Sequence, residues 1–398
     1  MKLIIEPQKK LLLFILIFFV VNLLQSFYTG LLEDEAYYWV WSRELAWGYF
    51  DHPPMVALWA AIGSTLFSGE LGIRLLSSIS FSLVIWIIWL LIDIKDKWQH
   101  LNLFLMLVIS MALIQVFGFV ITPDTPLLLF MSLFLLSYKR FLENESWLNS
   151  IFLGLSMAAM LYSKYHGILL IGFVVISNLR LFLKTKFWFA ALTGIILFLP
   201  HLYWQYDNGF PSFIYHLQER NKRPYNINKT ITHLLNMLVV VGLAFPVVYS
   251  AFYKYRVQNK FDKSLIFVVY GFFVFFLLTS FKSTPQAQWL LGISIPILII
   301  AFRYLIVQAK PRAWLIRLGF IQLGILILAR LLLAIPEFSP VILEPHRAEL
   351  WIPDLEKKTE GKPLVFVNSY SKASIYRFYT GIQTHSYSVL RGRMSQYN

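Results

Sequence analysis

Long apolar runs separated by short polar links occupy the sequence from Leu11 to Ile335. Each run has about 17 to 22 residues, which is enough for a helix to cross the roughly 30 Å hydrocarbon layer of a membrane. We place about eleven such spans by this criterion, at 11–28, 72–92, 101–120, 126–141, 147–162, 167–183, 188–203, 232–252, 265–281, 290–307 and 315–335. The pattern predicts an all-α polytopic membrane protein, with a transmembrane domain at 1–335 and a carboxyl-terminal segment at 336–398.

The segments outside the spans carry weaker signals. Residues 36–39 and 55–59 lie in the long first loop and form amphipathic, aromatic-rich stretches that suit helices lying at the membrane interface. In the tail, residues 363–367 predict a strand, and residues 371–379 predict a short helix that stops at Gly381. The tail would therefore be a small α/β segment outside the membrane.

The composition agrees with a chain whose main solvent is lipid. Hydrophobic residues make up 58% of the 398 residues and charged residues only 14%, a balance that soluble domains of this length rarely show. The chain has no cysteine, which excludes disulfides, thiolate metal sites and cysteine nucleophiles. Any chemistry therefore depends on carboxylates, histidines and cations.

The formal net charge of +14 resides mostly in every second link between the spans. These links contain Lys95 and Lys97, then Lys139 and Arg140, then Arg180, Lys184 and Lys186, then Lys254, Arg256, Lys260 and Lys263, and finally Arg303, Lys310, Arg312 and Arg317. Because Lys and Arg favour cytoplasmic loops, the alternation predicts a cytoplasmic amino terminus and a carboxyl terminus on the outer side. The charge is explained by topology, and we expect no nucleic-acid partner.

The links at the opposite face contain the unusual polar residues. The first loop opens with the acids at 33–35 and continues to Asp51 and His52 in the turn Gly-Tyr-Phe-Asp-His-Pro-Pro-Met. The second loop contains Asp124 within Thr-Pro-Asp-Thr-Pro. Each motif by itself is also typical of a helix cap or a turn. Their common location on one face favours a functional site at the ends of the spans.

The later loops on this face add cations where the topology predicts few. Lys164 and His166 lie in the third loop, Arg220 lies in the fourth beside two further cations, and Lys282 lies in the fifth. A bound anion near the outer interface would explain these positive charges. The phosphate of a membrane lipid is the obvious candidate.

Several segments resemble, in order along the chain, the bacterial polyprenyl-phosphate-sugar glycosyltransferases of the GT-C superfamily, whose relatives include protein O-mannosyltransferases and the aminoarabinose transferase of lipid A. The segments are Asp34-Glu35-Ala36-Tyr37-Tyr38-Trp39, Gly48-Tyr49-Phe50-Asp51-His52-Pro53-Pro54-Met55, Thr122-Pro123-Asp124, Ser163-Lys164-Tyr165-His166, Lys282-Ser283-Thr284-Pro285-Gln286-Ala287-Gln288-Trp289, and parts of the tail from Ser369 onward. The first two are the most specific. Lipid A transferases usually have Glu-Lys in place of Asp51-His52, and many relatives extend further, so the acceptor and the role of the tail stay open.

The resemblance implies transfer of one sugar from a polyprenyl phosphate donor, such as undecaprenyl phosphate, to a lipid, glycan or protein acceptor at the outer face of the cytoplasmic membrane, usually with inversion. Asp34 would take the proton of the acceptor hydroxyl. Asp124 would orient the acceptor or hold a metal, and Glu35 would secure the loop more than react. Cations would bind the lipid phosphate, and the candidates are Lys164, Arg220 and Lys282.

Asp51, His52 and His166 offer carboxylate and imidazole ligands that together suit a divalent ion such as zinc or manganese. Hydrogen-bonded packing would use the same groups, so the cofactor stays open. A transporter or lipid flippase is the main alternative function, and it predicts charges or Gly/Pro breaks in the middle of the spans. A structural scaffold is a third. Polar clusters at the ends of the spans favour an enzyme that works at an interface.

Overall fold

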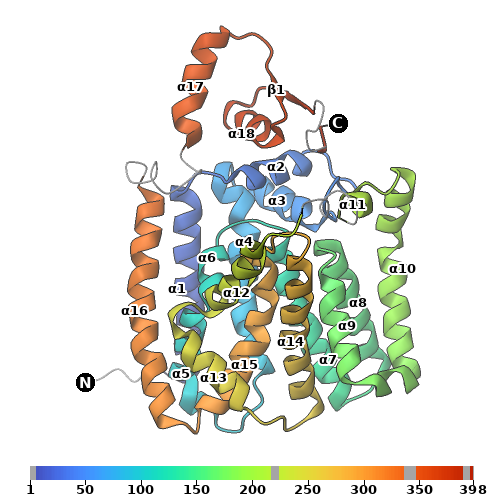
Figure 1. Ribbon diagram of the computed structural model, residues 1–398, viewed down its shortest axis with the longest axis vertical. Helices are drawn as coiled ribbons and strands as arrows, with labels where there is room; N and C mark the ends of the chain where they lie inside the picture. Colours follow the sequence, from blue (N-terminus) through green and yellow to red (C-terminus); the bar gives the residue numbers. More distant parts are fainter. Residues whose placement is uncertain (1–5, 217–223, 336–346, 389–394, 398) are drawn as a thin grey trace.

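The computed structural model describes residues 6–216, 224–335, 347–388 and 395–397. Most of this chain is helical (Figure 1). The helices up to the fourth loop are α1 (Pro7–Tyr28), α2 (Glu33–Ser42), α3 (Met55–Leu66), α4 (Gly69–Leu91), η1 (Lys97–His100), α5 (Leu101–Ser110), α6 (Ala112–Phe117), α7 (Asp124–Glu143), α8 (Trp147–Ser163), α9 (Gly167–Ser177), η2 (Leu179–Leu183), α10 (Thr185–Asp207) and α11 (Pro211–Ile214). They are followed by α12 (Ile227–Val241), η4 (Gly242–Ala244), α13 (Phe245–Lys254), α14 (Lys260–Ser280), η5 (Ala287–Ile293), α15 (Ser294–Leu305), α16 (Ala309–Ala334), α17 (Arg347–Thr359), β1 (Val365–Val367), α18 (Tyr370–Thr380) and β2 (His385–Tyr387).

Each of the predicted spans coincides with one helix or with consecutive helices. Within the described residues, 8 helical segments are long and apolar enough to cross a membrane: α1, α4, α7, α10, α12 to α13, α14, η5 to α15, and α16. The remaining predicted spans fall on the α5–α6 pair, α8 and α9, which are shorter. The prediction of a helical, multi-span membrane protein is confirmed. The count of eleven spans stays a prediction.

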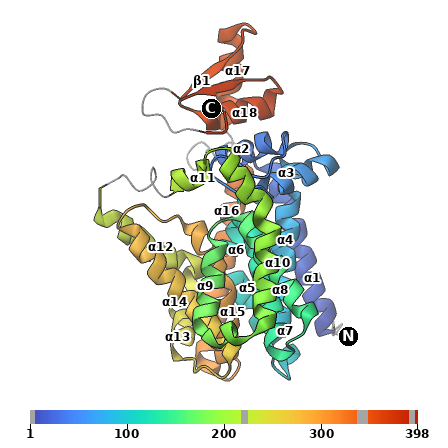
Figure 2. The same cartoon turned by 90° about the vertical axis from the view of Figure 1, so that its right-hand side faces the viewer.

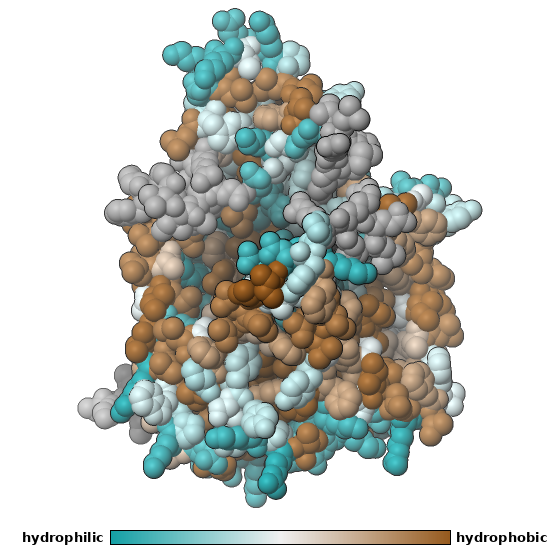
Figure 3. Space-filling model, in the orientation of Figure 1, coloured by the Kyte–Doolittle hydropathy of each residue, from teal (hydrophilic) through white to brown (hydrophobic). Residues whose placement is uncertain are grey.

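The helices divide into an interior group and a peripheral group. α4, α7 and the η5 to α15 segment bury most of their apolar surface, whereas α1, α10 and α16 leave most of theirs exposed. Figure 3 shows a belt of apolar side chains across the middle of one face and hydrophilic side chains gathered at its lower end. Exposed apolar helices have no stable place in water, so the peripheral group marks the surface that faces lipid.

Two helical runs are interrupted inside the bundle, and one glutamine serves both interruptions. Between α5 and α6, Gln322 on α16 donates its Nε2 to the carbonyl groups of Ile109 and Ser110 at 3.2 and 3.1 Å. Between α12 and α13, Gly242 has a φ of 67°, and the following Leu243 N–H donates to Gln322 Oε1 at 2.8 Å. Backbone polar groups are very costly to leave unpaired in lipid. Gln322 therefore makes both breaks tolerable.

The first loop and the carboxyl-terminal segment form a cap at one end of the bundle (Figure 2). The predicted helices of the first loop are present as α2 and α3, and α18 packs on α2, with the ring centroids of Tyr37 and Tyr370 4.5 Å apart. The tail reaches back to the first loop, because Gln396 N–H donates to the Tyr37 hydroxyl at 2.6 Å and Gln396 Oε1 accepts the N–H of Phe50 at 2.9 Å. The cap is therefore continuous with the turn that contains Asp51 and His52.

The tail contains more structure than its sequence predicts. The expected strand and helix are present as β1 and α18, and α18 ends at Gly381, whose φ is 72°. The structure adds β2, which pairs in parallel with β1, and α17, which was not expected because it contains Pro353 and a run of charges. Residues 336–346 lie outside the described residues, so the domain boundary between 335 and 336 stays a prediction.

Candidate active site

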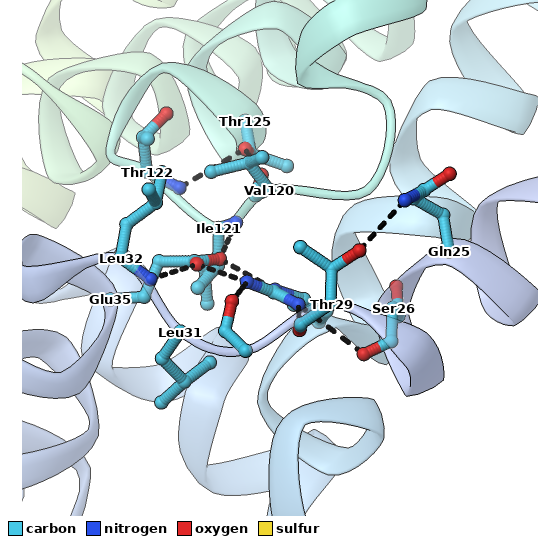
Figure 4. Close-up of polar contacts among 12 residues, drawn as sticks. Gln25, Ser26, Thr29, Leu31, Leu32, Glu35, Val120, Ile121, Thr122 and Thr125 are labelled. Atoms are coloured by element: carbon cyan, nitrogen blue, oxygen red, sulfur yellow. Dashed lines mark hydrogen bonds and ion pairs between the residues drawn. The ribbon is translucent and has the colours of Figure 1, made fainter. Parts of the chain in front are cut away.

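A buried ion pair between Glu35 and Arg74 lies where the first loop meets the bundle. Both residues have no exposed surface. Arg74 Nε lies 2.8 Å from Glu35 Oε1, and Arg74 Nη2 lies 2.5 Å from Glu35 Oε2. Glu35 also accepts the backbone N–H groups of Leu32 at 3.0 Å and Ile121 at 2.9 Å (Figure 4). Both carboxylate oxygens are therefore engaged in contacts that join the first loop to the bundle.

Arg74 extends this network to the end of α1. Its Nη1 and Nη2 groups donate to backbone carbonyl groups at the last turn and exit of that helix, at Ser26, Thr29 and Gly30. The pair thus fixes α1, α2, α4 and the link before α7 to one another. The sequence analysis missed Arg74, although an arginine inside a predicted span is a recognisable signal because such residues are expensive in a membrane.

Asp34 directly precedes Glu35 on α2 but has the opposite environment, because its side chain is exposed. Tyr38 lies one turn further along α2. Burial raises the pKa of Tyr38 well above its usual value, and the charges of Asp34, Asp51 and Asp124 raise it further. Acids from three separate segments therefore act electrostatically on the same phenol.

Asp124 is the first residue of α7 and pairs with Lys164, which follows α8. Lys164 Nζ lies 2.6 Å from Asp124 Oδ2, and both side chains are buried. The ammonium of Lys164 also lies 5.9 Å from the centre of the Trp289 ring. The helix dipole of α7 and the ammonium both stabilise the negative charge of Asp124. Two predicted site residues thus lie side by side in a polar pair beneath the cap.

The turn that contains Asp51 and His52 is fixed through its backbone. The carbonyl of Tyr49 accepts the hydroxyl of Ser212 at 2.9 Å, and the carbonyl of Asp51 lies 2.9 Å from His216 Nε2. Ser212 belongs to α11 and His216 follows it, so the fourth loop packs on the first. These contacts orient the buried Asp51 side chain without using its carboxylate.

A second histidine network supports the same turn and was not expected from the sequence. His201 on α10 is buried, and its Nδ1 and Nε2 lie 2.6 Å from the carbonyl of Trp47 and 2.9 Å from the hydroxyl of Tyr165. Gln205 Nε2 donates to the same hydroxyl at 3.0 Å. His201 falls inside the predicted span at 188–203, where a histidine is as recognisable a signal as Arg74 and was likewise left unused.

The predicted metal ligands do not form a metal site. Within the described residues no three His, Asp or Glu side chains are placed so that they could hold an ion. The ring of His166 packs against Trp289 and Phe276 at centroid distances of 5.2 and 5.4 Å, whereas the ring of His52 lies beside α2. We therefore derive no step through a metal at these residues.

The outer cations have different environments. Arg220 lies outside the described residues. The side chain of Lys282 is exposed, and its carbonyl accepts the ammonium of Lys229 at 2.9 Å. Lys229 also donates to the carbonyl of Pro224 at 3.0 Å, so this buried cation, which was not predicted, holds the loops together. The phosphate-binding roles of Lys164, Arg220 and Lys282 stay predictions.

Comparisons with known proteins agree with the predicted resemblance. The family described as dolichyl-phosphate-mannose-protein mannosyltransferase matches residues 51–204. The lipid A galacturonosyltransferase RgtD of Rhizobium johnstonii is 25% identical over 240 residues, which are 56% of this chain and 48% of that protein. The chain therefore spans about half the length of this curated relative.

Solved structures match almost the whole chain. The apo structure of ArnT from Cupriavidus metallidurans has a TM-score of 0.72 at 16% identity and covers 98% of this chain and 87% of that one. The structure of the same protein bound to undecaprenyl phosphate has a TM-score of 0.71 at 17% identity and covers 95% and 86%. At these identities the likeness concerns the fold. Together with the sequence matches it confirms the predicted GT-C resemblance.

Proposed function

We propose that this chain, with the sequence motifs and the fold of GT-C polyprenyl-phosphate-sugar glycosyltransferases, is a membrane glycosyltransferase. It transfers one sugar from a polyprenyl phosphate such as undecaprenyl phosphate to a lipid, glycan or protein acceptor. The observation that carries the proposal is the buried Asp124–Lys164 pair at the end of the apolar bundle, beneath the cap whose first loop contains Asp34 and Asp51. ArnT, which shares the fold, has been solved with undecaprenyl phosphate, and this supports the class of donor.

The two neighbouring acids of α2 have different roles in this proposal. Asp34 is exposed and can reach an acceptor, whereas the carboxylate of Glu35 is held in an ion pair with Arg74. In the proposed step the acceptor oxygen attacks the anomeric carbon, its proton passes to the Asp34 carboxylate, and the bond from the anomeric carbon to the phosphate oxygen breaks with inversion. A base within hydrogen-bond reach is needed because the acceptor hydroxyl becomes acidic only as the new bond forms.

The departing lipid phosphate gains negative charge and needs cations. Lys164 is placed for this role because it lies among the acids at the site, where its ammonium would be shared between Asp124 and the phosphate. Asp124 thereby controls the orientation of Lys164. Lys282, which is exposed, and Arg220, which lies outside the described residues, are the further candidates.

A transporter or lipid flippase is the main alternative function. It would place charged groups along a path through the bundle, whereas Asp34 and Asp124 lie in the first turns of α2 and α7 and Asp51 lies in the first loop. The decisive assay uses the purified chain, an undecaprenyl phosphate that carries a radiolabelled sugar, and a membrane extract as the source of acceptors. Transfer of the label to an acceptor supports the proposal, and movement of intact donor between leaflets without cleavage contradicts it.

We further propose that the cap lies on the outer side of the cytoplasmic membrane, because the basic links lie at the opposite end of the bundle from the cap. The chain has no cysteine, so single cysteines can report the topology. In intact cells an impermeant maleimide should label Glu44→Cys and Lys282→Cys but not Gln258→Cys, three positions that are exposed on the protein. Labelling of Gln258→Cys alone would reverse the orientation.

Donor recognition should depend on Lys282. Lys282→Ala removes an exposed cation on the capped side, and we expect the affinity for polyprenyl phosphate to fall by about tenfold to a hundredfold, the usual worth of a hydrogen bond to a charged group. Lys260→Ala removes an exposed cation at the opposite end and is the matched control. The affinity is measured by titrating the purified variants with a fluorescent polyprenyl phosphate, and equal affinities for both variants would remove Lys282 from the site.

A further inference from the structure

A cavity lies far from the cap, between α13, α15 and α16, and the transferase proposal does not use it. Its volume is about 490 Å³, which falls within the range of about 300–1,000 Å³ that is typical of ligand pockets. α13 lines it with Pro246, Val247, Ser250 and Lys254, and α16 lines it with Lys310 among others. Figure 1 shows α13 and the start of α16 at the end of the bundle opposite the cap.

Two lysines line this cavity without an acidic partner. Lys254 and Lys310 are exposed, and neither forms an ion pair with the residues that the structure describes. Neither residues 241–260 nor residues 301–335 contain an Asp or a Glu. Two positive charges at one cavity repel each other unless an anion lies between them. An anion bound at this cavity would relieve that repulsion.

Few of the cations in the basic links are neutralised within the chain. Lys139 lies 3.5 Å from Asp93, Lys184 pairs with Glu145, and Arg303 lies 2.8 Å from a buried acid of α14. Among the described residues the other cations of these links, Lys260 and Lys263 included, form no ion pair. Lys254 and Lys310 are distinguished from them because both line the same cavity.

The other residues that line the cavity supply a mainly apolar surface with two hydroxyl-bearing side chains. Val247 and Leu318 supply an aliphatic surface, and Trp314 supplies an aromatic ring that also stacks with Arg317 at 5.4 Å. The hydroxyl groups of Ser250 and Tyr304 line the same space. A purely soluble anion would gain nothing from the aliphatic surface, whereas an amphiphile would use both parts. Basic pockets between membrane helices bind anionic lipid headgroups by this combination.

We propose that this cavity binds one anionic diacyl phospholipid. The phosphate diester lies between the ammonium groups of Lys254 and Lys310, the hydroxyl groups donate to its oxygens, and the acyl chains follow the walls formed by Val247 and Leu318. The lipid would fasten α13 to α16 at the end of the bundle where the basic links gather. The inference is independent of the transferase activity, because it concerns the opposite end of the molecule.

The test compares lipid binding by full-length variants in nanodiscs or by native mass spectrometry from detergent. Dioleoylphosphatidylglycerol should bind the unmodified chain as one tight copy. Each basic residue near an anionic lipid contributes about fivefold to the binding affinity. Lys254→Gln with Lys310→Gln should therefore weaken lipid binding by roughly 25-fold. Ser250→Trp keeps both positive charges but fills the cavity, and it should weaken lipid binding to a similar extent.

The matched control is Lys260→Gln with Lys263→Gln, which removes the same charge from exposed positions at the start of α14. Binding by this control should stay within about twofold of the unmodified chain, as expected for charges outside the contact. Equal loss in the control would overturn the site in favour of diffuse attraction. Equal binding of dioleoylphosphatidylcholine would overturn the role of the lysines, and complete displacement by inorganic phosphate would show a soluble-anion site instead.

Discussion

Replacing Asp34 with asparagine should reduce turnover by about 10²- to 10⁴-fold, the contribution of a positioned general base. Asparagine keeps the size of the side chain and most of its hydrogen bonding but removes the basicity. Because Asp34 is exposed at the start of α2 and does not belong to the buried network of Glu35, folding should survive. The measurement is transfer of labelled sugar from polyprenyl phosphate by purified, monodisperse protein, with donor affinity determined separately.

Glu33→Gln is the matched control, since Glu33 lies in the same first turn of α2 and loses the same charge. Its turnover should stay within a few fold of the unmodified enzyme. If Asp34→Asn keeps more than about a tenth of the turnover, the loss is smaller than a general base would cause. Asp34 would then be a helix cap, and Asp124 would become the leading candidate for the base.

Replacing Glu35 with glutamine should destabilise the protein by about 3–5 kcal/mol, because it leaves the charge of Arg74 buried without a carboxylate. Arg74 has no exposed surface and would retain only backbone carbonyl groups as acceptors. The loss is measured as the shift in denaturant or thermal unfolding of the purified protein in micelles. Turnover, expressed per folded molecule just after purification, should fall less than in Asp34→Asn.

Two further variants distinguish the effect of breaking a buried ion pair on stability from the effect of losing a charge anywhere in the protein. Asp354→Asn breaks an exposed pair with Lys358 on α17 and should change stability by less than about 1 kcal/mol. Glu35→Gln combined with Arg74→Met removes both charges and should recover part of the stability, since the penalty arises from the unpaired partner. A single Glu35→Gln variant as stable as the unmodified protein would show that the pair does not hold the loop.

The periodic features of the fold could be read from the sequence because lipid imposes a simple rule on length and polarity. The spans, the two helices of the first loop, the strand and helix of the tail, and the helix stop at Gly381 all follow from local patterns. β2 and α17 could not be found in this way. A three-residue strand is defined by its partner β1, and a helix with an internal proline contradicts its own propensity.

In the candidate site, individual residues could be recognised from the sequence, but most of their partners could not. Asp34, Asp51 and Asp124 were recognised as unusual in their loops, and the charges of all three act on the Tyr38 hydroxyl. The partner of Asp124 was not predictable, because Lys164 meets it across two helices. Arg74, which meets Glu35 across the first loop, carried a visible signal that was left unused. His166 was predicted as a metal ligand, and only tertiary packing reveals that its ring lies against Trp289.

The contacts of Gln322 have a consequence for how the protein is made. The interrupted runs at Ser110 and Gly242 are synthesised well before α16, which carries the glutamine that satisfies them. Until α16 enters the membrane, a nascent chain carries bare carbonyl and N–H groups at lipid depth. We therefore expect the insertion machinery to shelter the early helices until α16 arrives.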